Sequence, residues 1–438
     1  MCTFYAFDLA MAVAVLEAAG ALSLEGAGSI VLLGELALDG RVRPVRGVLP
    51  ALLAATRAGF GRAVVARANA DEARLVPGLR VHAVASLESL VSWLRDGAKD
   101  VAQPVGPPRP LDDPPLVLDL ADVLGQSGGR RVVEVAAAGG HHVLFTGPPG
   151  TGKTMLAERL PGVLPALDPE AALEVTAVHS VAGHLPAGSP LVTRPPLCAP
   201  HHTATVAALV GGGSGIPRPG AASLAHRGVL LLDEAPEFAS GVLDALRQPL
   251  ESGEVVLARA AGTARYPARF QLILAANPCP CAPVTGLSLH CTCSPAARLR
   301  YAARLSGPLL DRVDIRHVVL SPNRAEMDAD RDHLESSADV ARRVLLARER
   351  TAHRLEGTGW RTNAEVSGVA LRRHYPPTLD GRRLVEREQD RGLLSPRGAD
   401  RVLRVAWTLA DLEGVARPDR PQLDEAIALR GAVPRVAA

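Results

Sequence analysis

Four residues between positions 147 and 154 have the types and the spacing of a phosphate-binding loop. Gly147, Gly152, Lys153 and Thr154 fit the pattern G-x-x-x-x-G-K-[ST], after an apolar segment at 142–145 and before a helical one. Glycines let successive backbone N–H groups approach an oligophosphate, and the following helix directs its positive dipole end at the same anion. The lysine would reach the β and γ phosphates, and the threonine hydroxyl would hold Mg²⁺. We therefore assign ATP binding to the whole turn: Gly147, Pro148, Pro149, Gly150, Thr151, Gly152, Lys153 and Thr154.

Lys153 also stands out in the composition. Only two of the 48 basic residues are lysine, at positions 99 and 153. A lysine ammonium is compact and rotatable, whereas an arginine guanidinium is planar and broad. In a chain that uses arginine almost everywhere else, a lysine at this position favours the phosphate role over a chance glycine-rich turn.

Two further apolar segments end in polar residues that suit the same chemistry. GVLLLDE, 228–234, is typical of a buried strand, after which Asp233 would bind Mg²⁺ through water and Glu234 would orient and polarise the attacking water. RFQLILAAN, 269–277, is a similar strand that ends in Asn277. Ligands sit at the carboxyl ends of parallel strands, so Asn277 would lie beside the γ-phosphate. The alternative is an ordinary asparagine that caps the following turn.

The composition is that of a globular chain with several domains. The 438 residues are 47% hydrophobic and 21% charged, and this length predicts about three domains. The net charge of +2 argues against strong overall attraction to polyanions, so a DNA contact must come from local patches or a ring's central channel. The arginines of the last third are most simply interpreted as solvated helix faces. The apolar N-terminus lacks a basic region and contains Asp8 and Glu17, so we expect no signal peptide and no membrane span.

Cysteines and histidines offer possible metal ligands. His201 and His202 could bind a metal, but adjacent histidines in a loop are more often hydrogen-bonded structure. Four thiolates with the spacing C-x-C-x₉-C-x-C would satisfy a closed zinc site, although one intervening residue strains the angle between ligands. Reduced thiols and disulfides are the alternatives; in a cytoplasmic chain, which we expect here, such clustering suggests metal before disulfides. The four residues are Cys279, Cys281, Cys291 and Cys293.

Longer blocks of the sequence match a known family. They are the segment 194–226, NPCPC at 277–281 and LSGPLLDRVDI at 305–315, together with the motifs above. These blocks resemble the ComM/YifB family of magnesium-chelatase-like AAA+ ATPases, and the resemblance covers nearly the whole chain. It implies an α/β P-loop ATPase core with a parallel sheet, a helical C-terminal lid and assembly into a homo-hexameric ring.

The resemblance also implies roles for three residues outside these strands. Arg312 matches the arginine finger that completes a neighbouring subunit's site, and Gln126 matches a residue near the nucleotide. Arg397 falls at the sensor 2 position, where a lid arginine meets the γ-phosphate; Arg404 on the same helix face is the second choice, and either could be a surface charge. Because an arginine finger contributes about 10³ to 10⁵ in rate, hydrolysis is expected to depend on assembly.

The same resemblance divides the chain into parts. Residues 1–98 look like the C-terminal half of a Lon-protease-like α/β domain, which would make the chain N-terminally truncated or assigned a late start. The Ser–Lys dyad positions of Lon fall near Ala6 and on Ala51, and this segment contains no lysine, so peptidase activity is not expected. The remaining parts are a proline-rich linker at 99–116, the ATPase core at 117–320 and the helical lid at 321–438.

Two classes of function agree with these motifs. The first is a DNA-directed motor, because the family includes helicases that drive branch migration of DNA during natural transformation. The second is a protein-remodelling ATPase subunit of a metal chelatase. The Lon-like segment and the NPCPC cluster favour the first, with single-stranded or branched DNA as the partner. The cations expected to face the channel are Arg194, Arg218, Arg247 and Arg259.

Overall fold

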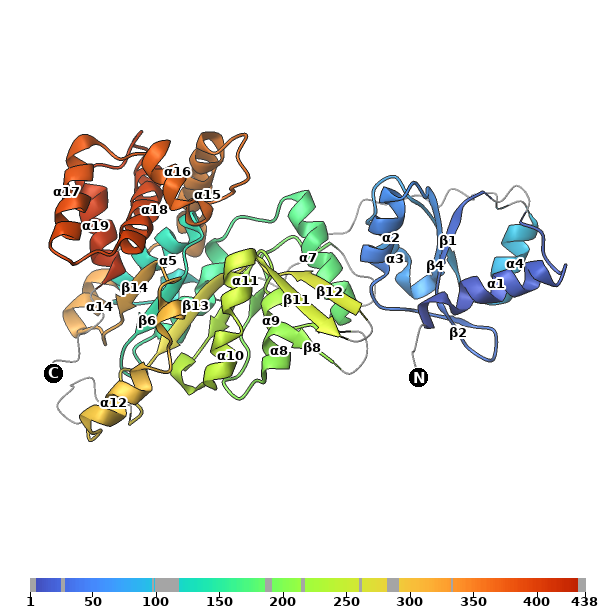
Figure 1. Cartoon of the computed structure of the whole chain (residues 1–438), viewed down its shortest axis with the longest axis horizontal. Coiled ribbons are helices and arrows are strands. Elements are labelled where there is room, and N and C mark those ends of the chain that lie inside the picture. The colour runs from blue at the N-terminus through green and yellow to red at the C-terminus, as the bar shows by residue number, and fades with distance from the viewer. Residues whose placement is uncertain are drawn as a thin grey trace.

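The computed structural model describes residues 5–24, 28–96, 98, 118–185, 191–213, 217–259, 262–281, 291–331 and 334–431. The predicted linker at 99–116 lies outside them. Figure 1 shows an elongated molecule, with an N-terminal α/β unit at one end, a parallel sheet and its helices in the middle, and a group of C-terminal helices at the other end. Among the described residues, no helix combines the length and the apolar character that crossing a membrane requires.

The central sheet has five strands in the order β14-β6-β13-β10-β7, and every neighbouring pair is parallel. Val143 lies opposite both Ile273 and Ile315, so β6 and β14 start at the same level and β13 starts two residues earlier. Helices cover both faces, which explains why these strands are continuous apolar runs. The predicted parallel α/β core is therefore confirmed. The strands are β6 (Val143–Thr146), β7 (Leu197–Cys198), β10 (Val229–Leu232), β13 (Gln271–Ala276) and β14 (Ile315–Val318).

Short helices and two antiparallel hairpins surround the sheet. The hairpins are β8–β9 and β11–β12, and both lie beside α8 and α9 in Figure 1. The apolar segment at 142–145 forms strand β6, shifted by one residue, a difference typical of element ends. The elements are η3 (Leu120–Asp122), α5 (Ser127–Gly139), α6 (Lys153–Arg159), η4 (Leu160–Val163), α7 (Pro169–Ala182), α8 (Val206–Val210), β8 (Gly211–Gly212), β9 (Arg218–Pro219), α9 (Ala221–Leu224), η5 (Ala235–Glu237), α10 (Ser240–Asp244), α11 (Arg247–Ser252), β11 (Glu254–Arg259), β12 (Gly262–Pro267), α12 (Pro295–Ala302) and α13 (Gly307–Leu310).

The N-terminal unit has its own parallel sheet, in the order β1-β4-β5. It contacts the rest of the chain through α7, since Leu173 and Ala177 pack against its core and the Ser180 hydroxyl donates to Glu72. Ala6 and Ala51 are ordinary alanines of this unit and supply no nucleophile. Its elements are η1 (Tyr5–Phe7), α1 (Asp8–Ala18), β1 (Ile30–Leu33), β2 (Glu35–Leu36), β3 (Val42–Arg43), α2 (Val48–Arg57), β4 (Arg62–Ala66), η2 (Arg67–Asn69), α3 (Ala70–Ala73), β5 (Arg80–Val84) and α4 (Leu87–Arg95).

The C-terminal region is helical in its described part, as predicted, and its two longest helices are α15 (Ser337–Arg354) and α18 (Pro396–Glu413). Each has a serine N-cap, Ser336 or Ser395, whose side chain accepts a backbone N–H of the first turn. The elements are α14 (Arg324–Arg331), α15 (Ser337–Arg354), η7 (Asn363–Glu365), α16 (Gly368–Arg373), α17 (Leu379–Asp390), α18 (Pro396–Glu413) and α19 (Arg420–Arg430).

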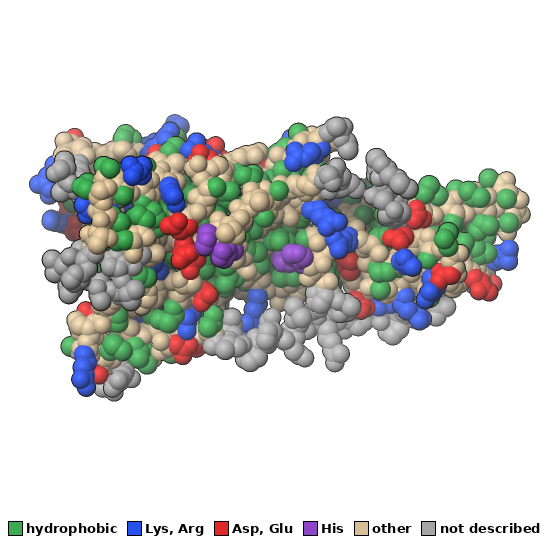
Figure 2. Space-filling model, turned by 90° about the horizontal axis from the view of Figure 1, so that it is seen from below, with side chains coloured by type: hydrophobic (Ala, Val, Ile, Leu, Met, Phe, Trp, Pro, Cys, Tyr) green, Lys and Arg blue, Asp and Glu red, His purple; other side chains and the backbone are tan. Residues whose placement is uncertain are grey.

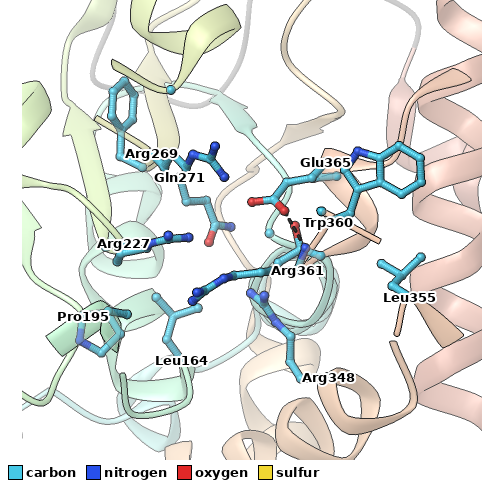
Figure 3. A pocket seen from close by; sticks show the side chains of 18 of the residues that line it. Leu164, Pro195, Arg227, Arg269, Gln271, Arg348, Leu355, Trp360, Arg361 and Glu365 are labelled. Atoms are coloured by element: carbon cyan, nitrogen blue, oxygen red, sulfur yellow. Dashed lines mark hydrogen bonds between the residues drawn. The ribbon is translucent and has the colours of Figure 1, made fainter. Parts of the chain in front are cut away.

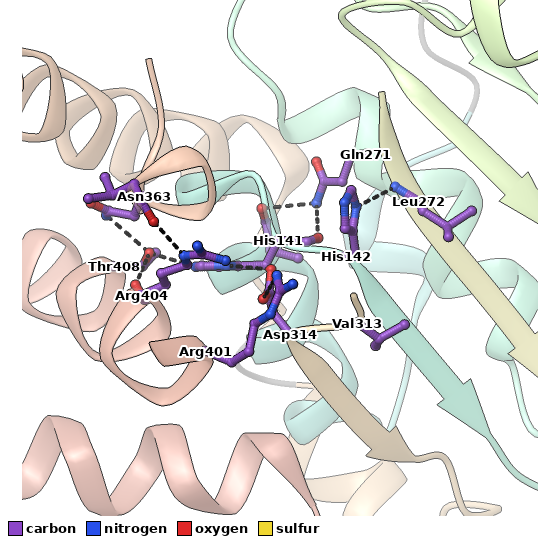
Figure 4. Close-up of polar contacts among 12 residues, drawn as sticks. His141, His142, Gln271, Leu272, Val313, Asp314, Asn363, Arg401, Arg404 and Thr408 are labelled. Atoms are coloured by element: carbon purple, nitrogen blue, oxygen red, sulfur yellow. Dashed lines mark hydrogen bonds and ion pairs between the residues drawn. The ribbon is translucent and has the colours of Figure 1, made fainter. Parts of the chain in front are cut away.

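A buried polar network joins these helices to the central sheet (Figure 4). Asp314, just before β14, accepts from Arg401 at 2.7 Å and lies 3.2 Å from His141 Nδ1, and His141 Nε2 lies 2.7 Å from the Thr408 hydroxyl. The Arg401 charge and the His141 bond outweigh burial and hold the pKa of Asp314 well below its usual range. The network thus ties α18 to the starts of β6 and β14.

The interpretation of the C-terminal arginines as solvated helix faces is wrong for several of them. Arg348 on α15 donates from Nε and Nη2 to the Ala137 carbonyl, at 3.0 and 2.6 Å. That carbonyl belongs to the last turn of α5, where helices leave acceptors without an internal partner. Arg354 pairs with buried Asp411. These guanidinium groups therefore hold the C-terminal helices in place.

Candidate nucleotide site

The phosphate loop connects β6 to α6 at the carboxyl edge of the sheet. Gly150 and Gly152 have φ values of 74° and 94°, a region that side chains disfavour. A Cβ atom at Gly147 would lie 2.1 Å from the Val319 carbonyl oxygen, so a larger residue does not fit there. The Thr151 hydroxyl donates to the Pro148 carbonyl at 2.9 Å and closes the turn. The loop thus has the open backbone that phosphate binding requires.

Lys153 lies inside the loop with only 7% of its surface exposed. Its ammonium group donates to the carbonyl oxygens of Gly147 and Pro148, at 2.8 and 2.6 Å, and to Asn277 Oδ1 at 3.2 Å. Burial lowers its pKa below the usual value, and the charges of Asp233 and Glu234 oppose this shift. All three of its protons are satisfied within a cradle of oxygens, which phosphate oxygens could replace.

Thr154 and Asp233 meet at one point beside the loop. The Thr154 hydroxyl donates to Asp233 Oδ2 at 2.8 Å, although the two residues come from different elements. A hydroxyl and a carboxylate oxygen are hard ligands of the kind that Mg²⁺ takes up together with phosphate oxygens and water. The pair therefore fits a magnesium ion at the place that the motifs predict.

Glu234 has an unusual backbone conformation for a residue with a side chain. Its φ of 50° and ψ of 42° place it in the left-handed region, at a cost of about 1 kcal/mol. Its backbone N–H donates to Asp233 Oδ1 at 2.8 Å. The carboxylate of Glu234 is 52% exposed just past the carboxyl end of β10, where a water-orienting group is expected.

His202 is a neighbour of Glu234 that the sequence reasoning did not find. Its Nδ1 lies 3.1 Å from Glu234 Oε2, while His201 Nδ1 lies 2.9 Å from the Thr203 hydroxyl. Both histidines are thus hydrogen-bonded, as the non-metal alternative proposed. The short strand β7 brings His202 to this place, because it pairs parallel with β10 and puts the following residues at the same edge as Glu234.

Asn277 and Gln126 support the loop from two sides. Asn277 follows β13 and accepts from Lys153, so it lies at the carboxyl edge as expected. Buried Gln126 donates to the carbonyl oxygens of Thr151 and Leu320, at 3.1 and 2.6 Å. Both residues therefore lie at the loop, while their contacts with a nucleotide stay predictions.

Arg312 lies at the opposite edge of the sheet. It precedes β14, whose first residue pairs with the first residue of β6, whereas the phosphate loop follows the last residue of β6. At about 3.3 Å per residue, a strand of this length separates the two by roughly 13 Å or more. Arg312 pairs with Glu251 of α11 and cannot reach its own loop in this arrangement.

An arginine-lined groove of about 1040 Å³ surrounds Arg312, between the amino edge of the sheet and the C-terminal helices. Figure 3 shows Arg227, Arg348 and Arg361 extending into the same space from three separate segments of the chain. Four carboxylates also line the groove, and several of its arginines are ion-paired: Arg227 with Glu174, Arg361 with Asp168, and Arg401 with Asp314. The lining arginines are Arg227, Arg269, Arg312, Arg348, Arg361, Arg401 and Arg404.

The two sensor 2 candidates lie on this same side. Arg397 is 85% exposed at the start of α18, with its Nη1 3.8 Å from Asp311 Oδ2. Arg404 is less exposed and donates from Nε to the Val366 carbonyl at 2.7 Å. Neither contacts the phosphate loop of its own chain within the described residues. Their predicted role therefore requires the loop of another chain.

The four cations predicted to contact DNA do not form one patch. Arg218 on β9 and Arg259 on β11 come together, because Gly212 pairs with Arg218 and also lies next to the Arg259 guanidinium. Arg247 lies elsewhere, paired with Asp244 at 2.6 Å. Arg194 is exposed just before β7. The two hairpins thus bring together only half of the predicted set.

Cysteine sulfur atoms form a further cluster at the end of β13. The Sγ atoms of Cys279, Cys281, Cys291 and Cys293 all lie within 4.8 Å of one another. The spacing found in the sequence thus corresponds to one site in space, beside the predicted sensor residue Asn277.

Known protein families match most of the chain. Three family models match: "Magnesium chelatase, subunit ChlI" over residues 119–327, "Magnesium chelatase, subunit ChlI C-terminal" over 334–430, and "Subunit ChlI of Mg-chelatase" over 5–69. The matches cover the central sheet with its phosphate loop, the C-terminal helices and most of the N-terminal unit.

Curated relatives match over almost the full chain. The uncharacterized protein Rv2897c of Mycobacterium tuberculosis is 55% identical over 97% of this chain and 83% of its own length. The competence protein ComM of Haemophilus influenzae is 40% identical over 98% and 82%, and the uncharacterized protein YifB of Escherichia coli is 39% identical over 97% and 81%. The chain therefore belongs to the ComM/YifB family of magnesium-chelatase-like AAA+ ATPases.

Proposed function

We propose that this protein is an ATP-driven motor that works as a homo-hexameric ring on single-stranded or branched DNA in the cytoplasm. The observation that carries the proposal is the separation of two half-sites by the central sheet. The loop, Asp233 and Glu234 lie at the carboxyl edge, and Arg312 lies at the amino edge of the same chain. A complete site then forms only where the two edges of neighbouring chains meet, as in a closed ring.

The residues of the carboxyl edge would bind ATP and direct water. Lys153 would exchange its contacts with the loop carbonyls for phosphate oxygens, and Glu234 would orient the attacking water and draw its proton. Thr154 and Asp233 would hold Mg²⁺, which neutralises charge on the β and γ phosphates when bound. The bond from Lys153 to Asn277 keeps the sensor residue next to the place of the γ-phosphate.

Arg312 of the neighbouring chain would stabilise the charge that develops on the transferred phosphoryl group. Its side chain is 18% exposed, and its present partner Glu251 is a surface carboxylate that an incoming triphosphate could replace. Burial and the nearby charges of Arg401, Arg247 and Arg397 lower the pKa of Arg312 below its usual value, because they disfavour another positive charge. An anion brought by a neighbouring chain would relieve that repulsion.

The DNA part of the proposal is supported by the family and by the two hairpins. One relative is named a competence protein, and the resemblance implies branch migration during natural transformation. Arg218 and Arg259 form no ion pair within the described residues, so their charges are available to phosphates. Figure 2 shows basic and acidic side chains interspersed on one face rather than a broad basic field. DNA binding is thus expected to need several chains whose hairpins act together.

The test is ATP hydrolysis by the assembled protein with and without single-stranded and branched DNA. We expect DNA to raise hydrolysis, and a labelled strand to leave a three-way junction only with ATP and Mg²⁺. Binding should weaken steeply with salt, because each phosphate contact releases counterions, and should show little sequence preference.

Matched variants locate the contact. Arg218→Gln with Arg259→Gln should weaken DNA binding and lower the salt slope by about one for each lost contact. Arg265→Gln on the same hairpin is the control, because Arg265 is already paired with Glu254 at 2.9 Å and should contribute little.

A protein-remodelling role is the second candidate, favoured by the match of all three family models to a magnesium chelatase subunit. It would take over if assembled rings with ATPase activity bind no DNA at low salt but are stimulated by a protein partner. The two outcomes are distinguishable because the first depends on salt and on the hairpin arginines.

A further inference from the structure

The four-cysteine cluster has the dimensions of a metal site. The distances between Sγ atoms are 3.4 Å for Cys279 and Cys281, 3.6 Å for Cys281 and Cys291, and 3.5 Å for Cys291 and Cys279. Cys293 completes the group within 4.8 Å. Sulfur ligands of a tetrahedral zinc ion, with Zn–S bonds of about 2.3 Å, lie about 3.8 Å apart. A disulfide requires about 2.05 Å, so the cluster matches the zinc geometry far better.

The chemistry of the ligands points to zinc rather than to the magnesium of the nucleotide site. Four thiolates are soft ligands, which favour Zn²⁺ over Mg²⁺. A set of four protein ligands leaves no open position for water, which is the arrangement of structural rather than catalytic zinc. Binding would release the four thiol protons to solvent and leave a site with a net charge of −2.

The cluster lies between the end of β13 and the start of α12, and few buried contacts hold this helix in place. Cys279 is 3% exposed and follows Asn277 by two residues, and Cys293 directly precedes the N-cap Ser294 of α12. Figure 1 shows α12 projecting from the body of the molecule. Of its eight residues only Tyr301 is buried, so apolar packing holds it weakly.

The residues that follow α12 contact the segment after Glu234. Arg304, just after this helix, donates to the Pro236 carbonyl at 2.9 Å and to Glu237 at 3.2 Å, close behind Glu234. A small element with so few buried groups is the kind that a metal clasp can stabilise.

We propose that Cys279, Cys281, Cys291 and Cys293 bind one Zn²⁺ ion, which fastens α12 to the end of β13. The zinc is structural and does not take part in hydrolysis. Metal binding itself depends only on the cluster and stands whether or not the motor acts on DNA.

The direct experiment is elemental analysis of the full chain purified without chelator. We expect one zinc per chain, released in step with modification of four thiols by an organomercurial. Absence of stoichiometric metal together with four reactive thiols would overturn the proposal, and so would two disulfides found by mass spectrometry under non-reducing conditions. Because these readings use the unmodified protein, they do not depend on a variant that folds.

Variants and a spectroscopic probe sharpen the result. Cys281→Ser and Cys291→Ser should each lose most of the zinc, whereas Cys198→Ala, which changes a cysteine outside the cluster, should keep it. Chain refolded with Co²⁺ should show the intense visible absorption of a tetrahedral thiolate complex. A weak octahedral spectrum would contradict the four-thiolate site.

Hydrogen exchange tests whether the zinc holds α12 in place at the end of β13. Removing zinc from the full chain should increase exchange in residues 295–302 and leave the buried strand β13 protected. Unchanged exchange in α12 after verified zinc loss would overturn this role of the metal. Exchange that rises throughout the central sheet would show that the metal stabilises the core instead.

Discussion

The two edges of the central sheet have opposite chemistry, although they belong to the same five strands. At the carboxyl edge the polar groups contact one another: Lys153 bonds to Asn277, Thr154 to Asp233, and His202 to Glu234. At the amino edge arginines outnumber carboxylates and line an open groove. One edge therefore has the groups suited to binding ATP and directing water, and the other collects arginines, most of them paired with carboxylates of the same chain.

Because the two sets of groups lie at opposite edges, a single chain should hydrolyse ATP poorly. A parallel sheet places its ligand site at one edge, so an arginine that precedes a strand is far from the loop that follows its neighbour. The arginine-rich edge can serve the site only by meeting the loop edge of a second chain.

The largest effect is expected at the carboxyl edge. Lys153→Ala should abolish nucleotide binding, because it removes the only ammonium in the loop. Glu234→Gln should keep nucleotide binding and stop turnover, because it removes only the carboxylate that orients water. Nucleotide binding and steady-state hydrolysis are measured for both, with Lys99→Ala, the only other lysine, as the control. Equal loss of binding in both variants would argue against this division of roles.

At the amino edge, acid should destabilise the fold through His226. Its side chain is 2% exposed, and burial lowers its pKa to about 4, against about 6.5 in the unfolded chain. Between these values only the unfolded chain binds the proton, so the free energy of unfolding falls as pH falls and is insensitive to this group above about 6.5. The contribution of His226 to the free energy of unfolding should be about 2 kcal/mol smaller at pH 5 than at pH 7.

Denaturant unfolding at the two pH values, compared with His226→Gln, isolates this contribution. The Nε2 of His226 lies 3.1 Å from Glu174 Oε2, a bond that glutamine can partly replace. The variant should lose less stability on acidification than the unmodified chain does. An equal loss in both would show that other groups carry the pH dependence.

The two sensor candidates should behave differently. Exposed Arg397→Ala should lower turnover by about 100-fold, the loss expected for one donor to transition-state charge, without changing stability. Arg404→Ala should lower the free energy of unfolding by about 1 to 3 kcal/mol, because it leaves the Val366 carbonyl without its donor. Hydrolysis and thermal unfolding distinguish them. If Arg404→Ala keeps its stability and loses turnover, the assignment moves to Arg404.

The smallest effect is expected for His202. His202→Ala should lower kcat by about tenfold and leave the KM for ATP unchanged, because one bond that positions Glu234 is lost. His201→Ala is the matched control, since His201 contacts Thr203 instead. A similar loss in both variants would indicate disruption of the loop rather than positioning of Glu234.

The carboxyl edge was largely predictable from the sequence. The glycine spacing marks the loop, and apolar runs that end in Asp233-Glu234 and Asn277 mark two neighbouring strands. Because parallel strands bring such ends together, their proximity follows from the pattern. The position of His202 could not be predicted in this way. The strand β7 that precedes it spans only two residues, which is too short for an apolar run that would predict a strand.

The amino edge was not predictable apart from Arg312. Its groove collects arginines that precede strands, such as Arg227 and Arg269, and others from the C-terminal helices, such as Arg348. Only the packing of α15 and α18 against the sheet brings them together. Local sequence shows these residues as ordinary charges, and the DNA candidates were overestimated for the same reason, because Arg247 is already paired with Asp244.

The central claim is that the two edges of different chains form one site, and mixing two inactive variants tests it most directly. Arg312→Ala and Glu234→Gln should each be nearly inactive alone. In verified mixed rings, about a quarter of the interfaces would combine an intact loop edge with an intact arginine, and hydrolysis should recover in proportion.

The control mixture is Lys153→Ala with Glu234→Gln. Both changes affect the carboxyl edge, so no interface in that mixture has a complete loop edge and hydrolysis should not recover. Recovery in the first mixture alone is the result that our account predicts. No recovery in either mixture, with mixed rings confirmed, would contradict a site shared between chains.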